Sequence, residues 1–237
     1  MTPTLDSIIS PADQLIIDAA MACKMLYVEG TERGDMAPLI IAQRKGVVLV
    51  TVVAPKVDKY QALDGALILR KSLDADRLLI ALDSHFATSL PGETPEQMAE
   101  RLPQGSMQKM CDEEGACATG VISDCLLCIS VGADGAFTQT VIPYDYHGKG
   151  TTFAWKIILT PQTFSGDGPY GLIPDNLRHI MADKSVTDDL FTVGASMGLS
   201  RPEMLYHGGR GGFMLLESRG YRVFNTMPPR TDLAWAS

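Results

Sequence analysis

The chain has 237 residues, of which 46% are hydrophobic and 20% are charged, and its formal net charge is −8. This composition is ordinary for a globular protein and excludes collagen, a disulfide-dense miniprotein and a wholly disordered chain. An acidic chain lacks the positive field with which nucleic-acid-binding proteins displace counterions from phosphates, so we expect no nucleic-acid partner.

The sequence predicts neither a membrane segment nor a secretory signal. Its apolar runs are shorter than the about 20 residues that a bilayer-spanning helix needs. The N-terminal stretch MTPTLDSIISPADQ contains Asp6 and Asp13 and lacks a basic flank, unlike a secretory signal. We therefore expect a cytoplasmic protein without membrane contact, whose five cysteines are thiols.

Residues 11–82 predict helices and strands in alternation. Ser10 and Pro11 are typical of a helix start, because serine caps a helix and proline suits its first turn. The sequence VVLVTVV at 47–53 is continuously apolar, which indicates a strand covered on both faces. The expected elements are a helix from Pro11, strands over 38–43 and 47–53, a helix over 57–73 and a strand over 77–82. Because a helix here joins two buried strands, we expect a parallel crossover.

This order of elements resembles the opening of the cytidine-deaminase-like folds and of the MPN (JAMM protease-like) folds. A zinc deaminase needs an H-x-E sequence at its second helix, whereas that helix here begins Tyr60-Gln61-Ala62-Leu63. A JAMM protease needs an H-x-H pair, and only His85 lies near the corresponding strand. The resemblance therefore implies an order of elements and neither activity.

The second half of the chain predicts antiparallel structure. Strands over 125–131 and 137–142 flank the sequence Gly-Ala-Asp-Gly, which is typical of a hairpin turn. The remaining expected elements are a strand over 152–159, helices over 174–183 and 185–196, a short helix from Ser200, and a terminal hairpin of strands over 213–216 and 221–224.

Together these elements predict an α/β to α+β fold. Its central sheet is expected to be mixed, with an early parallel crossover, later antiparallel strands and helices on the faces. The length suits a single globular domain over 1–237. Alternatively, residues 174–237 form a helical or hairpin appendage at the C-terminus.

The best candidate site in the sequence is Asp83-Ser84-His85. These residues follow a predicted buried strand, where α/β sheets bind ligands, and they open a long insertion over 84–123. A carboxylate, a hydroxyl and an imidazole can orient one another or a substrate. However, neighbours on a strand point to opposite faces, so the three cannot all serve one reaction centre. The bland alternative, a polar strand end that caps the next turn, is the interpretation that we favour.

Four cysteines lie close together in the sequence, at Cys111, Cys117, Cys125 and Cys128. Four thiolates can hold a tetrahedral zinc ion, and the last two have the C-x2-C spacing of a zinc knuckle. Against this, residues 124–129 read as a strand, which would send Cys125 and Cys128 to opposite faces. We favour small core residues over a metal site and expect no cofactor, with zinc as the alternative.

Three glycine-rich sequences match known motifs without the context that those motifs require. The G-x-S-x-G at 194–198 is followed only by Glu203 and His207 as possible acid and histidine, and the 41 residues after Ser196 are too few for the rest of a hydrolase sheet. The G-x-G-x-x-G at 166–171 lacks a surrounding βαβ unit. Gly208, Gly209 and Arg210 could place main-chain amides and a guanidinium around an anion. A flexible entry to the terminal hairpin accounts for these three residues as well.

Because every catalytic motif lacks its context, we expect a non-enzymatic protein that binds or assembles with a protein partner or with itself. The twelve methionines agree with this expectation, since adaptable methionine side chains serve contact surfaces as well as cores. One alternative is a hydrolase or transferase that acts at the Asp83–His85 strand end beneath the 84–123 insertion. The other is a module stabilised by zinc at the four cysteines.

Overall fold

The computed structural model describes residues 9–31, 34–55, 61–87, 92–94, 96–97, 100, 122–156, 161–164, 172–183 and 192–225. Its longer helices are α1 (Pro11–Gly30), α2 (Ala62–Leu73), α5 (Leu172–Ala182) and α7 (Arg201–Ser218), and residues 192–196 form a further short helix. Its strands are β1 (Leu39–Arg44), β2 (Val47–Val53), β3 (Arg77–Ala87), β4 (Ile122–Gly132), β5 (Phe137–Asp145), β6 (Ala154–Trp155), β7 (Gln162–Phe164) and β8 (Arg222–Asn225).

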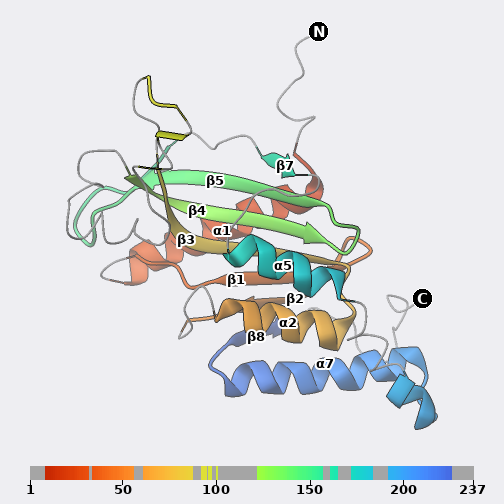
Figure 1. The fold of residues 1–237 in the computed structure, drawn as a ribbon. Coiled ribbons are helices and arrows are strands. Elements are labelled where there is room, and N and C mark those ends of the chain that lie inside the picture. Colours follow the sequence, from red (N-terminus) through yellow and green to blue (C-terminus); the bar gives the residue numbers. More distant parts are fainter. Residues whose placement is uncertain are drawn as a thin grey trace.

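The strands form one sheet in the order β6-β5-β4-β3-β1-β2-β8, with β7 also paired to β5 (Figure 1). Every strand pair among the described residues is antiparallel. The predicted mixed sheet with an early parallel crossover is therefore wrong. β2 and β3 do run in the same direction, but β1 lies between them and pairs antiparallel with both. The helix α2 thus connects two strands that are not neighbours.

Helices cover both faces of the sheet and make two separate apolar cores. On one face, side chains of α2, α5 and α7 pack against the strands; the core there includes Leu69, Leu177 and Leu216. On the other face, α1 packs against β3, β4 and β5, with Ile16 and Ile17 in the core. The central strand β1 is buried along its whole length, because both cores press on it.

The predicted strand at 47–53 is confirmed as β2, but its place in the sheet differs from expectation. β2 is next to the edge strand β8, and its burial alternates, with Val47 exposed and Thr51 and Val53 half-buried. The fully covered strand is β1. The continuous apolar run thus did not distinguish a central strand from its neighbour, since adjacent strands share the same two cores.

The first helix is confirmed and begins as the sequence predicts. The side chain of Ser10 accepts a hydrogen bond from the Asp13 amide at 3.2 Å, and Pro11 occupies the first helical turn. Asp13 is buried, and its carboxylate also accepts hydrogen bonds from the Ser10 hydroxyl at 2.6 Å and from the hydroxyl of Thr138 in β5. Asp13 therefore supports the Ser10 cap of α1 and fastens the N-terminal end of the helix to the sheet.

The predicted terminal hairpin is wrong. Residues 213–216 belong to the helix α7, and β8 pairs with β2 instead. Phe213 and Leu216 are both buried against α2 and the sheet, and their separation of three residues is the spacing of a helix. The prediction failed because a run of four apolar residues is too short to reveal its period. Gly212 lets the two helices approach closely: a Cβ there would lie 2.3 Å from the Ser72 hydroxyl oxygen of α2.

The hairpin of β4 and β5 is confirmed, and so is the helix α5. Of the strand predicted over 152–159, the structure describes residues 152–156, and the strand found there is β6, which pairs with the end of β5. None of the helices in the described ranges is long and apolar enough to cross a membrane.

Candidate functional site

The candidate residue Asp83 lies inside β3 and not beyond its end, because that strand continues to Ala87. Alternation along the strand sends Asp83 to the same face as Leu79 and Ala81, which belong to the core beneath α1. The carboxylate therefore points into the space between the sheet and α1. The predicted position at a strand end is corrected to one in the middle of a pairing strand.

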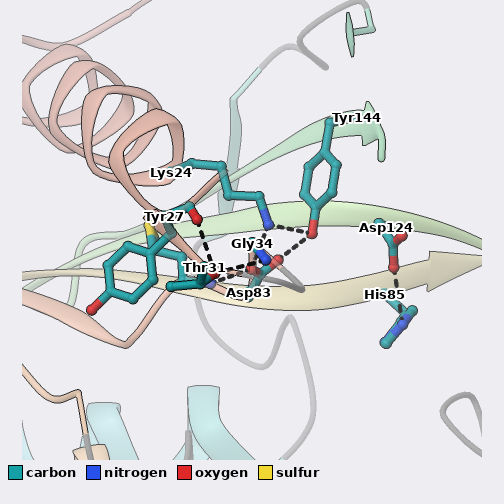
Figure 2. A network of polar contacts seen from close by, with 9 residues as sticks. Lys24, Tyr27, Thr31, Gly34, Asp83, His85, Asp124 and Tyr144 are labelled. Carbon is teal, nitrogen blue, oxygen red and sulfur yellow. Dashed lines mark hydrogen bonds and ion pairs between the residues drawn. The ribbon is translucent and has the colours of Figure 1, made fainter. Parts of the chain in front are cut away.

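Beneath α1, Asp83 joins Lys24 and Tyr144 in a closed polar network (Figure 2). The Lys24 Nζ donates to Asp83 Oδ2 at 2.7 Å and to the Tyr144 hydroxyl oxygen at 2.8 Å. The Tyr144 hydroxyl donates to Asp83 Oδ1 at 2.5 Å, and the main-chain amide of Met36 donates to Asp83 Oδ2 at 2.7 Å. The carboxylate thus accepts three hydrogen bonds, from a helix, a strand and the segment before β1.

The network is closed to solvent on the helix side. The Lys24 side chain is 1% exposed and that of Asp83 is 16% exposed, so an ammonium and a carboxylate neutralise each other in a nearly dry place. Burial, together with the charge and hydrogen bond of Asp83, raises the pKa of Tyr144. The phenol therefore stays protonated, and it acts as a hydrogen-bond donor and not as a base.

The segment between α1 and β1 is folded tightly against the network. The Gly34 amide donates to the Thr31 hydroxyl at 2.8 Å, and that hydroxyl donates to the main-chain oxygen of Tyr27 at 2.9 Å. Gly34 has φ +69°, and a Cβ on it would lie 2.6 Å from Cε1 of Tyr146. Two residues further on, the Met36 amide completes the hydrogen bonds of Asp83.

His85 makes a separate pair on the same face. It lies directly opposite Asp124 in the β3–β4 register, and its Nε2 is 3.0 Å from Asp124 Oδ1. Both side chains are half-buried. Figure 2 shows this pair beside the Lys24 network, with no dashed line joining the two. The charge of Asp124 nevertheless contributes to the raised pKa of Tyr144.

Ser84 points to the opposite face of the sheet, since strand neighbours alternate. The structure therefore brings together neither a Ser-His-Asp triad nor any two of Asp83, Ser84 and His85: the three residues have different partners or different faces. The sequence argument that they cannot serve one centre agrees with this geometry.

The two cysteines of the predicted cluster that the structure describes lie in β4. Cys128 faces α1, and its Sγ is 4.0 Å from the Ile16 main-chain oxygen, whereas alternation turns Cys125 to the other face. Burial raises the pKa of Cys128 to about 12, so its thiol is protonated at neutral pH. Cys111 and Cys117 lie outside the described residues. Among the described residues, no three histidine, cysteine or acidic side chains gather as metal ligands would.

The predicted anion site at Gly208, Gly209 and Arg210 lies within α7, not in a hairpin entry. Main-chain amides in the middle of a helix donate to carbonyl groups one turn earlier, so they do not face a ligand. Gly209 is buried, while Arg210 is exposed on the outer face of the helix. The G-x-S-x-G serine, Ser196, is also in a helical turn, where its hydroxyl donates to the Val193 oxygen at 2.6 Å.

Lys24 and Tyr144 are the two site residues that the sequence argument missed. Lys24 carried a usable signal: it continues the buried stripe of α1 formed by Ile16, Ile17 and Ala20 at helical spacing. A lysine on such a stripe needs a buried partner. Tyr144 gave no comparable signal, because its sequence surroundings are rich in turn residues.

Comparisons with known proteins give no relative. No family model matches the chain, and no curated protein or solved structure matches it either.

Proposed function

We propose that this protein acts by binding and not by catalysis, and that its partner is a second copy of the chain, joined through the edge strand β8. The observation that carries the proposal is the exposure of Phe224, a large apolar side chain that is 55% exposed on that edge strand. The closed Lys24 network supports the first half of the proposal, and the geometry of the sheet edge supports the second.

The Lys24–Asp83–Tyr144 network has the features of a structural connection. The carboxylate of Asp83 already accepts three hydrogen bonds from the protein, and the Lys24 ammonium is buried. A general base must reach a substrate proton, and a nucleophile must be accessible to the reacting atom. These groups instead fasten α1 to the sheet, as Asp13 and Thr138 do at the other end of the helix.

The edge at β8 offers a surface for a second sheet. In the described part of the chain, β8 is the last strand on its side, and it pairs only with β2. Phe224 lies opposite Thr51 and therefore on the face of α1, whose contacts are mainly with β3, β4 and β5 (Figure 1). The Phe224 side chain stays 55% exposed there. An apolar side chain on a sheet edge that no strand of the described ranges covers favours strand pairing with another chain.

Two copies of β8 can pair antiparallel across a two-fold axis, because each strand of an antiparallel pair then makes the same hydrogen bonds to the other. With the axis at Phe224, the two phenylalanine rings would lie opposite each other on one face. A cross-strand aromatic pair contributes about 0.2–1 kcal/mol. The arginines at position 222 would then lie at opposite ends of the pair, so like charges are kept apart.

Sedimentation velocity of the full chain over a range of concentrations tests the proposal. We expect the wild-type protein to sediment as a dimer and the Phe224→Glu variant as a monomer, since two carboxylates would face each other across the axis. Met214→Glu is the matched control, because Met214 is 68% exposed but lies on α7, on the opposite face of the sheet. It should leave the dimer intact.

Circular dichroism of each variant checks that the fold is retained. A wild-type protein that remains a monomer at every concentration contradicts the proposal. A Phe224→Glu variant that still dimerises excludes β8 as the interface.

The His85–Asp124 pair favours a second candidate, a hydrolase or transferase. An imidazole held by a carboxylate at 3.0 Å and still 20% exposed to solvent is suited to general-base catalysis. A broad substrate panel with His85→Ala and Ser84→Ala variants tests it. If this pair is catalytic, any turnover is lost in His85→Ala and retained in Ser84→Ala, because Ser84 points to the other face. Turnover that survives His85→Ala contradicts this placement.

A further inference from the structure

Away from the Lys24 network, three arginines converge on the single carboxylate of Asp74. Arg44 at the end of β1 approaches Oδ2 at 3.2 Å, Arg70 in the last turn of α2 approaches Oδ1 at 3.4 Å, and Arg201 at the start of α7 approaches Oδ2 at 2.5 Å. Three elements thus each contribute one guanidinium to one point. We call Asp74 with these arginines the arginine cluster.

The arginine cluster holds more positive charge than its carboxylate neutralises. Arginine is protonated at all ordinary pH values, so three guanidiniums and one carboxylate leave a charge of +2. The side chains of Arg44 and Arg70 are only 10% and 7% exposed. The carboxylate of Asp76, two residues further along the chain, accepts a hydrogen bond from the Lys45 amide at 2.7 Å, whereas the ion pairs of the three arginines are with Asp74.

Two donors of the arginine cluster have no acceptor. Nη1 of Arg44 and Nε of Arg70 are buried, and within the described part of the chain neither has a hydrogen-bond partner. A buried donor without an acceptor costs about 1–3 kcal/mol, and more when it carries charge. Buried polar groups of this kind call for a specific explanation, of which a bound ion is one.

The backbone at Asp74 is also strained in a way that serves the cluster. Asp74 ends α2 in the left-handed conformation, with φ 49° and ψ 42°, which is uncommon for a residue other than glycine. Strained backbone persists where the surrounding structure demands it and is frequent at functional sites. Here it holds the carboxylate at the point where the three guanidiniums meet.

We propose that the arginine cluster binds an oxyanion of the phosphate class. Guanidinium groups match the planar oxygen pairs of phosphate and carboxylate groups with two parallel hydrogen bonds, and a dianion would neutralise the remaining +2. The oxyanion would enter the cluster from the side of Arg201, because the Arg201 side chain is 50% exposed while those of Arg44 and Arg70 are buried. The N-terminal end of α7, where Arg201 lies, adds its positive dipole to the same place.

Inorganic phosphate is the probe for the test, measured by isothermal titration calorimetry and by the thermal unfolding midpoint at constant ionic strength. Phosphate stabilises many proteins without a site by exclusion from their surface, so saturation of the midpoint shift is the required result. We expect saturable binding to the wild-type protein. Arg201→Gln should weaken it about tenfold or more, which corresponds to the loss of one charge-assisted hydrogen bond.

Arg219→Gln is the matched control, because Arg219 is also 50% exposed and lies at the end of the same helix. Its acidic partner within the described ranges is distant, Asp64 at 3.9 Å. It should bind phosphate like the wild-type protein. Asp74→Asn gives a second readout. It raises the charge of the cluster, so its unfolding midpoint should fall without phosphate and recover when phosphate is added.

The inference is independent of self-association, since it concerns a different part of the fold. It is overturned if the wild-type protein shows no saturable phosphate binding, or if Arg201→Gln and Arg219→Gln respond alike. It is also overturned if Asp74→Asn is destabilised and phosphate does not restore it; the cluster would then be purely structural.

Discussion

Replacing Lys24 by methionine tests whether the buried network holds α1 on the sheet. Methionine keeps most of the length of the side chain and its apolar contacts but removes the ammonium. The carboxylate of Asp83 then loses its only ionic partner in the network and keeps two neutral donors, the Met36 amide and the Tyr144 hydroxyl. The substitution therefore separates the charge of Lys24 from its packing.

The size of the effect follows from the burial of the pair. Removing one partner of a buried ion pair costs about 3–5 kcal/mol, because the other charge is left in a poorly solvated place. Asp83 keeps 16% of its side-chain exposure and two hydrogen bonds, so we expect the lower end, about 3 kcal/mol. For a domain of this size that corresponds to a fall of about 6–12 °C in the unfolding midpoint.

Urea unfolding followed by circular dichroism measures this loss in the free energy of unfolding. Lys71→Met is the matched control, because Lys71 is exposed on α2, and it should change stability by no more than about 0.5 kcal/mol. In the double variant with Asp83→Asn the unpaired charge is gone. The loss of unfolding free energy in the double variant should then be about 2 kcal/mol smaller than the sum of the losses in the two single variants.

Two results would refute this reasoning. If Lys24→Met changes stability no more than Lys71→Met does, the network does not stabilise the helix. If the effects of Lys24→Met and Asp83→Asn simply add, the two groups do not interact in the folded protein.

Three further predictions concern glycines and a buried thiol. Gly212→Ala should destabilise the protein by about 1–3 kcal/mol, because the added Cβ would meet α2. Gly211→Ala has open space around its Cβ and should stabilise the helix by about 0.5–1 kcal/mol. Urea unfolding that ranks the two variants in the opposite order contradicts this packing. Gly34→Ala should cost more than Gly46→Ala in the same assay, since both have positive φ but only Gly34 meets a tyrosine ring. The protonated thiol of Cys128 contributes stability that is fully present below pH 9 and is lost as the pH rises toward 12, because the unfolded thiol ionises first. Cys128→Ala should therefore reduce the slope of stability against pH in this range by up to about 1.4 kcal/mol per unit, and an unchanged slope means that this thiol does not titrate there.

Local sequence signals identified most elements correctly where one residue type or a short pattern decides the structure. Ser10 and Pro11 start α1 because a side-chain cap and a fixed φ act within one turn. The Gly-Ala-Asp-Gly sequence joins β4 to β5 because the turn brings neighbouring strands together directly. The segment at 213–216 failed because four apolar residues fit a strand and a helix equally well.

The candidate site was predictable only in part. Asp83 was selected as a polar residue beside a buried strand, and Lys24 was detectable as a charge on a buried helical stripe. Their partnership was not detectable, because 59 residues separate them in the chain and Tyr144 lies a further 61 residues on. Only the packing of α1 across β3 and β5 brings the three side chains together.

The amino-acid sequence alone indicated an acidic chain with enough apolar residues for a core, a capped first helix and the hairpin of β4 and β5. Only the tertiary structure decided that β1 lies between β2 and β3, which makes the sheet antiparallel throughout the described residues. It also decided that Lys24 meets Asp83 and that three arginines meet Asp74. The physical reason is the same in each case. Propensity and turn chemistry act over a few residues, whereas strand order and buried charge pairs depend on which distant surfaces exclude water together.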